Sequence, residues 1–155
     1  ERYMWGDVEP SHDYWYHHDY DADWTDAAAF NWGENWRVPS RAEWEELAEN
    51  CYWEMDTVGV IAGFRATSKV PGFEDQSIFL PYPHHKATYN MYMTSELVQT
   101  NLEKRNCWSF YITNTPRRVN IQGNDGAGER FNEHSYIINR DRDYYYSVRA
   151  VRQKK

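Results

Sequence analysis

The chain has 155 residues, a formal net charge of −7 and a mean hydropathy of −0.96. Its length suits one domain with a hydrophobic core, and its apolar runs fall well short of the roughly 20 residues that span a bilayer, so we expect no membrane insertion. Residues 1–56 hold 15 of the 24 acidic residues and 3 of the 17 basic ones. This acidic first third excludes a general nucleic-acid binder, since such a protein presents a basic face.

Aromatic side chains make up 17% of the chain, and large rigid side chains of this kind favour interfaces as well as cores. Residues 11–23 combine Tyr and Trp with several His and Asp side chains, without a hydrophobic period. These His and Asp side chains fit either a metal site or a solvated acidic loop. The absence of a ligand spacing such as His-x-x-x-His favours the loop, so we expect neither a metal ion nor another cofactor.

A first helix is predicted in an alanine-rich segment. Thr25 or Asp26 has a side chain that can cap the helix at its N-terminus, and three consecutive alanines follow. Gly33 is suited to end the helix after Trp32, because glycine adopts the backbone conformation that terminates helices.

A second helix is predicted shortly afterwards. Ser40 and Glu43 have the S-x-x-E spacing of a capping box, in which each side chain accepts a hydrogen bond from the backbone of the other residue. Trp44, Leu47 and Ala48 lie at positions i, i+3 and i+4, so one face of this helix is apolar and faces the core. We expect the helix to end near residues 50–51.

The rest of the chain consists of short strand-like segments separated by glycine and proline. The predicted strands are 52–55, 60–67, 77–80, 91–95, 107–113, 117–121, 135–138 and 145–152, with a further short one at the start of the chain. Two helices followed by many short strands are typical of an α+β domain with its helices on one side of an antiparallel sheet. We expect a single domain that covers residues 1–155.

Several groups of residues together have a recognisable pattern. They are Asn31-Trp32-Gly33, Trp36-Arg37-Val38-Pro39-Ser40, Glu43-Trp44-Glu45-Glu46-Leu47 and Tyr146-Ser147-Val148-Arg149-Ala150-Val151-Arg152. The pattern resembles the Fibrobacter succinogenes major paralogous domain, which is common in Bacteroidetes and is similar to variable proteins of diversity-generating retroelements. The resemblance implies a C-type lectin-like fold of class α+β, in which two helices pack on short antiparallel strands and the N- and C-terminal strands are near each other.

In such variable proteins the C-terminal part displays diversified residues that bind ligands. The resemblance therefore implies a receptor- or adhesin-type binding protein whose variable region covers about residues 88–147. Replacement of template adenines in Asn-type codons yields Asn, Asp, Tyr, His, Ser, Thr, Arg or Gly, which leaves Met93, Glu96 and Trp108 as framework. The candidate ligand-binding residues are Tyr89, Asn90, Tyr92, Asn106, Tyr111, Asn114, Arg118, Asn120, Asn139, Asp141, Asp143, Tyr144 and Tyr145.

The composition of this set is that of an antibody paratope, in which Tyr supplies contact area and Asn, Asp and Arg supply adaptable hydrogen bonds. We expect a binding role for residues 141–145, whereas Tyr111, Arg118 and Asn120 fit a binding role and a framework role equally well. The partner implied is an unknown protein or glycan on a cell surface. The location implied is extracellular, on a cell surface or on a phage particle.

Other functions are compatible with parts of the sequence. A structural module of a bacterial surface or secreted protein, without programmed diversity, has the same composition. The C-type lectin fold also resembles formylglycine-generating enzymes, which use a pair of cysteines, but Cys107 stands alone in the C-terminal half and nothing places a base beside it. A calcium-dependent lectin typically carries Glu-Pro-Asn or Gln-Pro-Asp with Trp-Asn-Asp, and this chain has only Gly123-Asn124-Asp125. We therefore expect a binding protein and not an enzyme.

Overall fold

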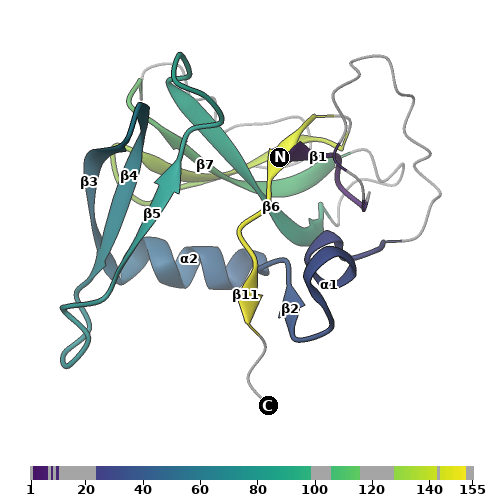
Figure 1. Ribbon diagram of the computed structural model, residues 1–155, viewed down its shortest axis with the longest axis horizontal. Helices are drawn as coiled ribbons and strands as arrows, with labels where there is room; N and C mark the ends of the chain where they lie inside the picture. The colour runs from purple at the N-terminus through teal and green to yellow at the C-terminus, as the bar shows by residue number, and fades with distance from the viewer. Residues whose placement is uncertain are drawn as a thin grey trace.

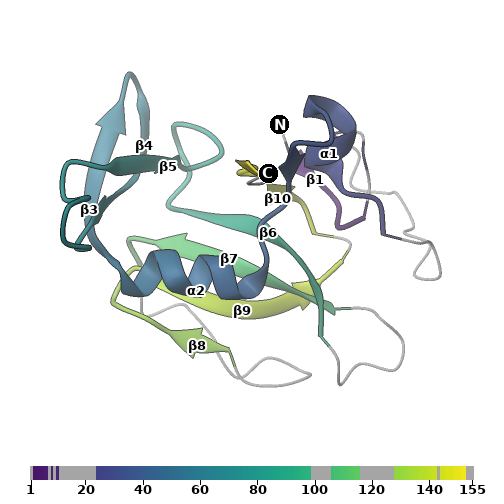
Figure 2. The ribbon, with the colours of Figure 1, turned by 90° about the horizontal axis from the view of Figure 1, so that it is seen from below.

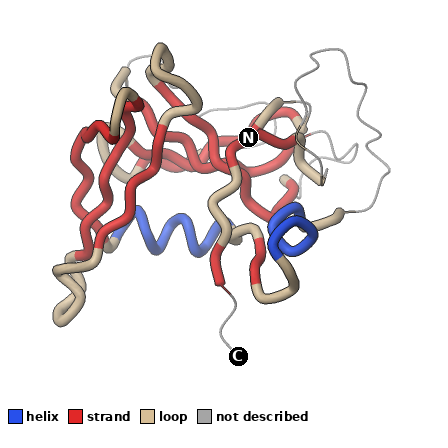
Figure 3. Tube along the Cα trace, in the orientation of Figure 1, coloured by secondary structure: helices blue, strands red, loops and turns tan. Residues whose placement is uncertain are grey.

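The computed structural model describes residues 2–6, 8, 10, 24–98, 106–115, 128–142 and 144–152. Strands make up 47% of these residues and helices 13%. Figure 3 shows that strands predominate along the chain. The expected C-type lectin-like fold of class α+β is therefore wrong: the structure is mostly β, with a curled six-stranded sheet and two helices. The physical reason is that the helices have only six and nine residues, so strands supply most of the buried surface.

Two helices and eleven strands are present in the described part of the chain (Figure 1). They are β1 (Arg2–Tyr3), α1 (Ala27–Trp32), β2 (Trp36–Arg37), α2 (Arg41–Glu49), β3 (Cys51–Val58), β4 (Ile61–Ser68), β5 (Ser77–Pro81), β6 (Tyr89–Leu97), β7 (Asn106–Thr113), β8 (Glu129–Arg130), β9 (Ser135–Asp141), β10 (Tyr146–Ser147) and β11 (Val151–Arg152). The six-stranded sheet has the order β1-β10-β6-β7-β9-β8, the three-stranded sheet the order β3-β4-β5, and β11 pairs with β2.

Both predicted helices are confirmed, together with their caps. Asp26 accepts hydrogen bonds from the backbone nitrogens of Ala28 and Ala29 at the start of α1, and Gly33 ends this helix with a φ of 99°. Ser40 and Glu43 form the capping box of α2. Neither helix is long and apolar enough to cross a membrane, which holds for the described residues only.

The predicted C-terminal strand is divided in two. Tyr146 and Ser147 form β10 between β1 and β6, whereas Val151 and Arg152 form β11, which pairs with β2. The alternation of apolar and polar residues fails where Ala150 and Val151 are adjacent, and the chain leaves the first sheet just before this point. The predicted strand 117–121 and the acidic segment 11–23 lie outside the described residues.

Strands β6 and β7 have both faces buried, because they separate two hydrophobic clusters. Tyr92 and Phe110 face the cluster that α2, β4 and β5 complete, whereas Met93 and Cys107 face the cluster that β1, α1 and β10 complete. A strand with one exposed face alternates polar and apolar residues. Both faces of β6 and β7 are buried, so these two strands are apolar at most positions.

Trp44 attaches α2 to the six-stranded sheet. Its ring stacks on Phe110 with centroids 4.6 Å apart and planes inclined by 7°, and its Nε1 donates a 3.2 Å hydrogen bond to the carbonyl oxygen of Met93. Figure 2 shows α2 lying across β7 and β9. This packing follows from the apolar face that the sequence predicts, since both Trp44 and Ala48 are buried.

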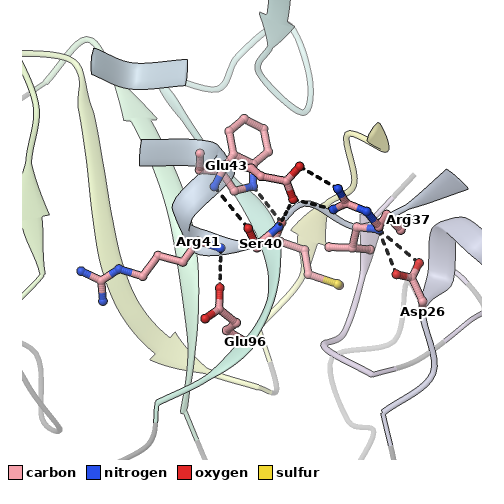
Figure 4. A network of polar contacts seen from close by, with 9 residues as sticks. Asp26, Arg37, Ser40, Arg41, Glu43 and Glu96 are labelled. Carbon is pink, nitrogen blue, oxygen red and sulfur yellow. Dashed lines mark hydrogen bonds and ion pairs between the residues drawn. The ribbon is translucent and has the colours of Figure 1, made fainter. Parts of the chain in front are cut away.

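A polar network joins the two helices to the sheets (Figure 4). Asp26 accepts a 3.0 Å hydrogen bond from the backbone nitrogen of Val38, in addition to its capping bonds. Arg37 donates two hydrogen bonds to the carboxylate of Glu43, which also accepts one from the backbone nitrogen of Ser40. These interactions lower the pKa of Glu43 to about 2, with the hydrogen bond from Arg37 as the largest cause.

Replacement of Trp44 by Ala should lower the free energy of unfolding by about 3–5 kcal/mol, because it removes a buried ring and leaves a cavity. The measurement is urea denaturation followed by circular dichroism. Phe30→Ala is the matched control, since Phe30 is 64% exposed on α1 and its loss should change the free energy by no more than about 0.5 kcal/mol. Equal effects of the two substitutions would contradict the assigned packing.

The stabilisation by Glu43 should depend on pH. Its folded-state pKa of about 2 lies below the ordinary value of 4.5, so the stabilisation is fully present above about pH 4.5 and is lost as the pH falls towards 2. The difference in unfolding free energy between the wild type and Glu43→Gln should therefore shrink over this range in urea denaturation. Glu49→Gln, the same replacement at an exposed position of the same helix that has no ion pair with a described residue, is the matched control. A constant difference for Glu43→Gln would refute the assignment.

Candidate functional site

The structure distributes the predicted binding residues over different environments. Tyr89, Asn114 and Tyr144 are exposed, and Tyr111, Asp141 and Tyr145 are partly buried. The buried members of the set are Asn90, Tyr92, Asn106 and Asn139. Three further candidates, Arg118, Asn120 and Asp143, lie outside the described residues.

Tyr89 and Tyr111 are brought together at the end of the six-stranded sheet where β6 begins and β7 ends. Their rings stack with centroids 5.4 Å apart and planes inclined by 16°. Tyr136 on β9 lies directly opposite Tyr111 and meets its ring edge-on at 6.4 Å. We call Tyr89, Tyr111 and Tyr136 the tyrosine platform, which extends over three adjacent strands.

The tyrosine platform has one accessible ring and two that hold it in place. Tyr89 is 46% exposed, whereas Tyr136 is buried and donates a 3.0 Å hydrogen bond from its hydroxyl to the carbonyl oxygen of Glu133. Burial raises the pKa of Tyr111 and of Tyr136 above the ordinary value of 10. Both phenols are therefore neutral at physiological pH.

Hydrogen bonds between neighbouring segments fix the chain around the tyrosine platform. The backbone nitrogen of Asn114 and the hydroxyl of Thr113 both donate to the carbonyl oxygen of Thr88, which joins the end of β7 to the start of β6. A ring nitrogen of His134 lies 3.1 Å from the carbonyl oxygen of Thr113, and the His134 ring packs on Phe64. The backbone around the platform is thus held from both sides, while the side chain of Asn114 is exposed next to it.

Asn90 and Tyr92 belong to the interior. The amide of Asn90 and the hydroxyl of Tyr92 both donate hydrogen bonds to the carbonyl oxygen of Pro81, at 2.9 and 2.7 Å. The Asn90 amide also donates to Ser147 on β10. These two side chains therefore fasten β5 and β10 to β6, and they do not contribute to an exposed binding surface as the sequence predicted.

Asn106 and Asn139 are buried as well. They lie on β7 and β9, with Asn106 opposite Asp141 and Asn139 opposite Trp108, and they are 9% and 3% exposed. Met93, one of the three residues that we expect in the framework, is fully buried. Composition alone could not separate these polar side chains from the exposed ones, because a buried amide with hydrogen-bond partners is stable inside a sheet.

The turn between β9 and β10 is a separate location. The backbone nitrogen of Tyr144 and the hydroxyl of Tyr146 both donate to the carbonyl oxygen of Asp141, and Tyr144 is 52% exposed. The guanidinium of Arg2 lies 5.8 Å from the centre of the Tyr145 ring. Of the predicted loop, Tyr144 is thus the described residue that is most available to a ligand.

The chemistry of the described residues bears on the alternatives considered above. Cys51 and Cys107 are free, buried thiols. Burial raises the pKa of Cys107 to about 12, so this thiol lacks the thiolate character that a nucleophile needs. Among residues 2–6, 8, 10, 24–98, 106–115, 128–142 and 144–152, no group of three or more His, Cys, Asp and Glu side chains is arranged to hold a metal ion.

Tyr136 is the member of the tyrosine platform that the sequence did not indicate. The sequence places Tyr136 in the predicted strand 135–138. It does not show that this strand lies beside β7, and so it does not show that Tyr136 lies opposite Tyr111. Comparison with known proteins gives no further assignment: no family model, no curated protein and no solved structure matches the chain.

Proposed function

We propose that this chain is a binding module that presents the tyrosine platform and Asn114 to a protein or glycan on a cell surface. The observation that carries the proposal is the stacked pair of Tyr89 and Tyr111, in which a half-exposed ring is already oriented by its neighbours. Stacking reduces the rotational freedom that a free tyrosine would lose on binding, so more of the contact energy appears as affinity.

The chemistry of this surface is suited to recognition. A tyrosine ring supplies apolar contact area and its hydroxyl supplies a hydrogen bond, and an exposed amide such as that of Asn114 both donates and accepts. Because the strands beneath are held by buried residues such as Phe110 and Ile112, the exposed side chains can differ without affecting the core. This separation is the requirement for a variable binding surface.

We further propose that any programmed diversification is confined to exposed positions. Tyr89, Asn114 and Tyr144 fit this limit, whereas changes at Asn90 or Tyr92 would remove the hydrogen bonds that join β6 to the carbonyl oxygen of Pro81 on β5. The neighbouring DNA provides the test: a reverse transcriptase gene and a near-copy of the coding segment that differs at adenines would support diversification. Adenine differences concentrated in the codons of Asn90 and Tyr92 would contradict the proposed limit.

Tyr89→Ala should weaken ligand binding at least about tenfold, because truncation of an anchoring aromatic at an interface typically costs 2 kcal/mol or more. The ligand is first identified by applying the labelled protein to an array of glycans and an array of extracellular protein domains. Affinity for the identified ligand is then measured by surface plasmon resonance. The melting temperature should change little, since Tyr89 is 46% exposed.

Tyr52→Ala is the matched control, because Tyr52 is 63% exposed on β3 and lies outside the tyrosine platform. It should leave the affinity unchanged. An equal loss of affinity with Tyr52→Ala, or full affinity with Tyr89→Ala, would show that the ligand binds elsewhere. The absence of any saturable ligand on both arrays would favour a structural module instead.

A further inference from the structure

A groove of about 610 Å³ lies beside α2 and shares no lining residue with the tyrosine platform. It is lined by residues of α2, by β4, β5 and their connecting hairpin, and by residues 149–151 just before and within β11. Figure 1 shows how these elements are arranged around α2. We call it the α2 groove. Its volume falls within the roughly 300–1,000 Å³ that is typical of small-molecule sites.

The α2 groove is mainly apolar. Trp44 and Leu47 on α2 and Ile78 on β5 line it, and Val151 lines the opposite side. Two large apolar side chains of the hairpin, Val70 and Phe73, also line it although they are 38% and 58% exposed. Exposed aliphatic and aromatic groups around a concave apolar surface are typical of a binding site for an apolar molecule.

The charges around the α2 groove favour an anionic group at one end. Arg149 lines the groove, is exposed, and forms no ion pair with a described residue. The carboxylate of Glu43, which also lines the groove, is already neutralised by Arg37. Glu46 is exposed on the same helix and is the competing negative charge. A guanidinium without a partner is well suited to bind a carboxylate through two parallel hydrogen bonds.

We infer that the α2 groove binds a small amphipathic carboxylate, with its aliphatic or aromatic body on Leu47 and Ile78 and its carboxylate on Arg149. The inference is independent of the proposed function, because it uses a different surface and different residues. Two features favour this class of ligand: the apolar groove has a suitable size, and the exposed guanidinium of Arg149 lines it.

The test compares three probes that share a ten-carbon chain and differ in charge: decanoate, 1-decanol and decylammonium. Binding is measured below the micellar concentration by isothermal titration calorimetry and located by the chemical shifts of backbone amides. Decanoate should bind most tightly and shift the amides of residues that line the groove. Arg149→Gln should weaken the binding of decanoate at least about tenfold, which is the effect expected for the loss of one charge-assisted hydrogen bond. It should leave the affinity for 1-decanol unchanged.

Two further variants serve as controls. Arg152→Gln removes a nearby exposed cation on β11 that does not line the groove, and it should leave decanoate binding unchanged. Glu46→Gln should preserve or strengthen decanoate binding, because it removes the competing charge. The inference fails if decanoate does not bind, if decylammonium binds as tightly, if the shifted amides lie elsewhere, or if Arg149→Gln has no effect. The comparison of probes on the wild type decides the matter even if a variant does not fold.

Discussion

The stacking of Trp44 on Phe110 is the contact on which the rest of the structure depends. It attaches the longer helix to the centre of the six-stranded sheet, and its indole also reaches the backbone of β6. Phe110 immediately precedes Tyr111, so the same strand that receives the helix on one face carries the tyrosine platform on the other. Trp44 also lines the α2 groove. Both candidate surfaces therefore rely on one aromatic contact for their shape.

The parts of the fold that the sequence predicted are those that local interactions determine. The caps of both helices involve residues within three positions of each other, and the apolar face of α2 is visible in its spacing. The order of the strands is different, because it depends on pairings between distant segments. Nothing local to Tyr146 and Ser147 indicates that they lie between β1 and β6. The incorrect fold class has a different cause: both helices are short, so strands make up most of the regular structure of the described residues.

The candidate site was predictable in composition but not in placement. Tyr89 and Tyr92 have the same side chain and lie on the same strand, but they point to opposite faces because they are three positions apart along the strand. The first is half exposed and the second donates to a backbone oxygen in the interior. On a strand with two buried faces, the sequence pattern does not reveal which polar residue lies at an open end. That information comes from the neighbouring elements, and hence from the tertiary structure.

The insertion of β10 between β1 and β6 has a consequence for biosynthesis. Strand β1 has no strand to pair with until residue 147 has left the ribosome, because β1 pairs with β10 and not with β6. Pairings between segments so far apart form slowly, since a long loop must close before any contact is gained. During this interval Tyr3 and Met93 would be exposed to water, as Tyr146 is not yet present to cover them. Completion of this sheet therefore depends on the synthesis of the C-terminal part of the chain.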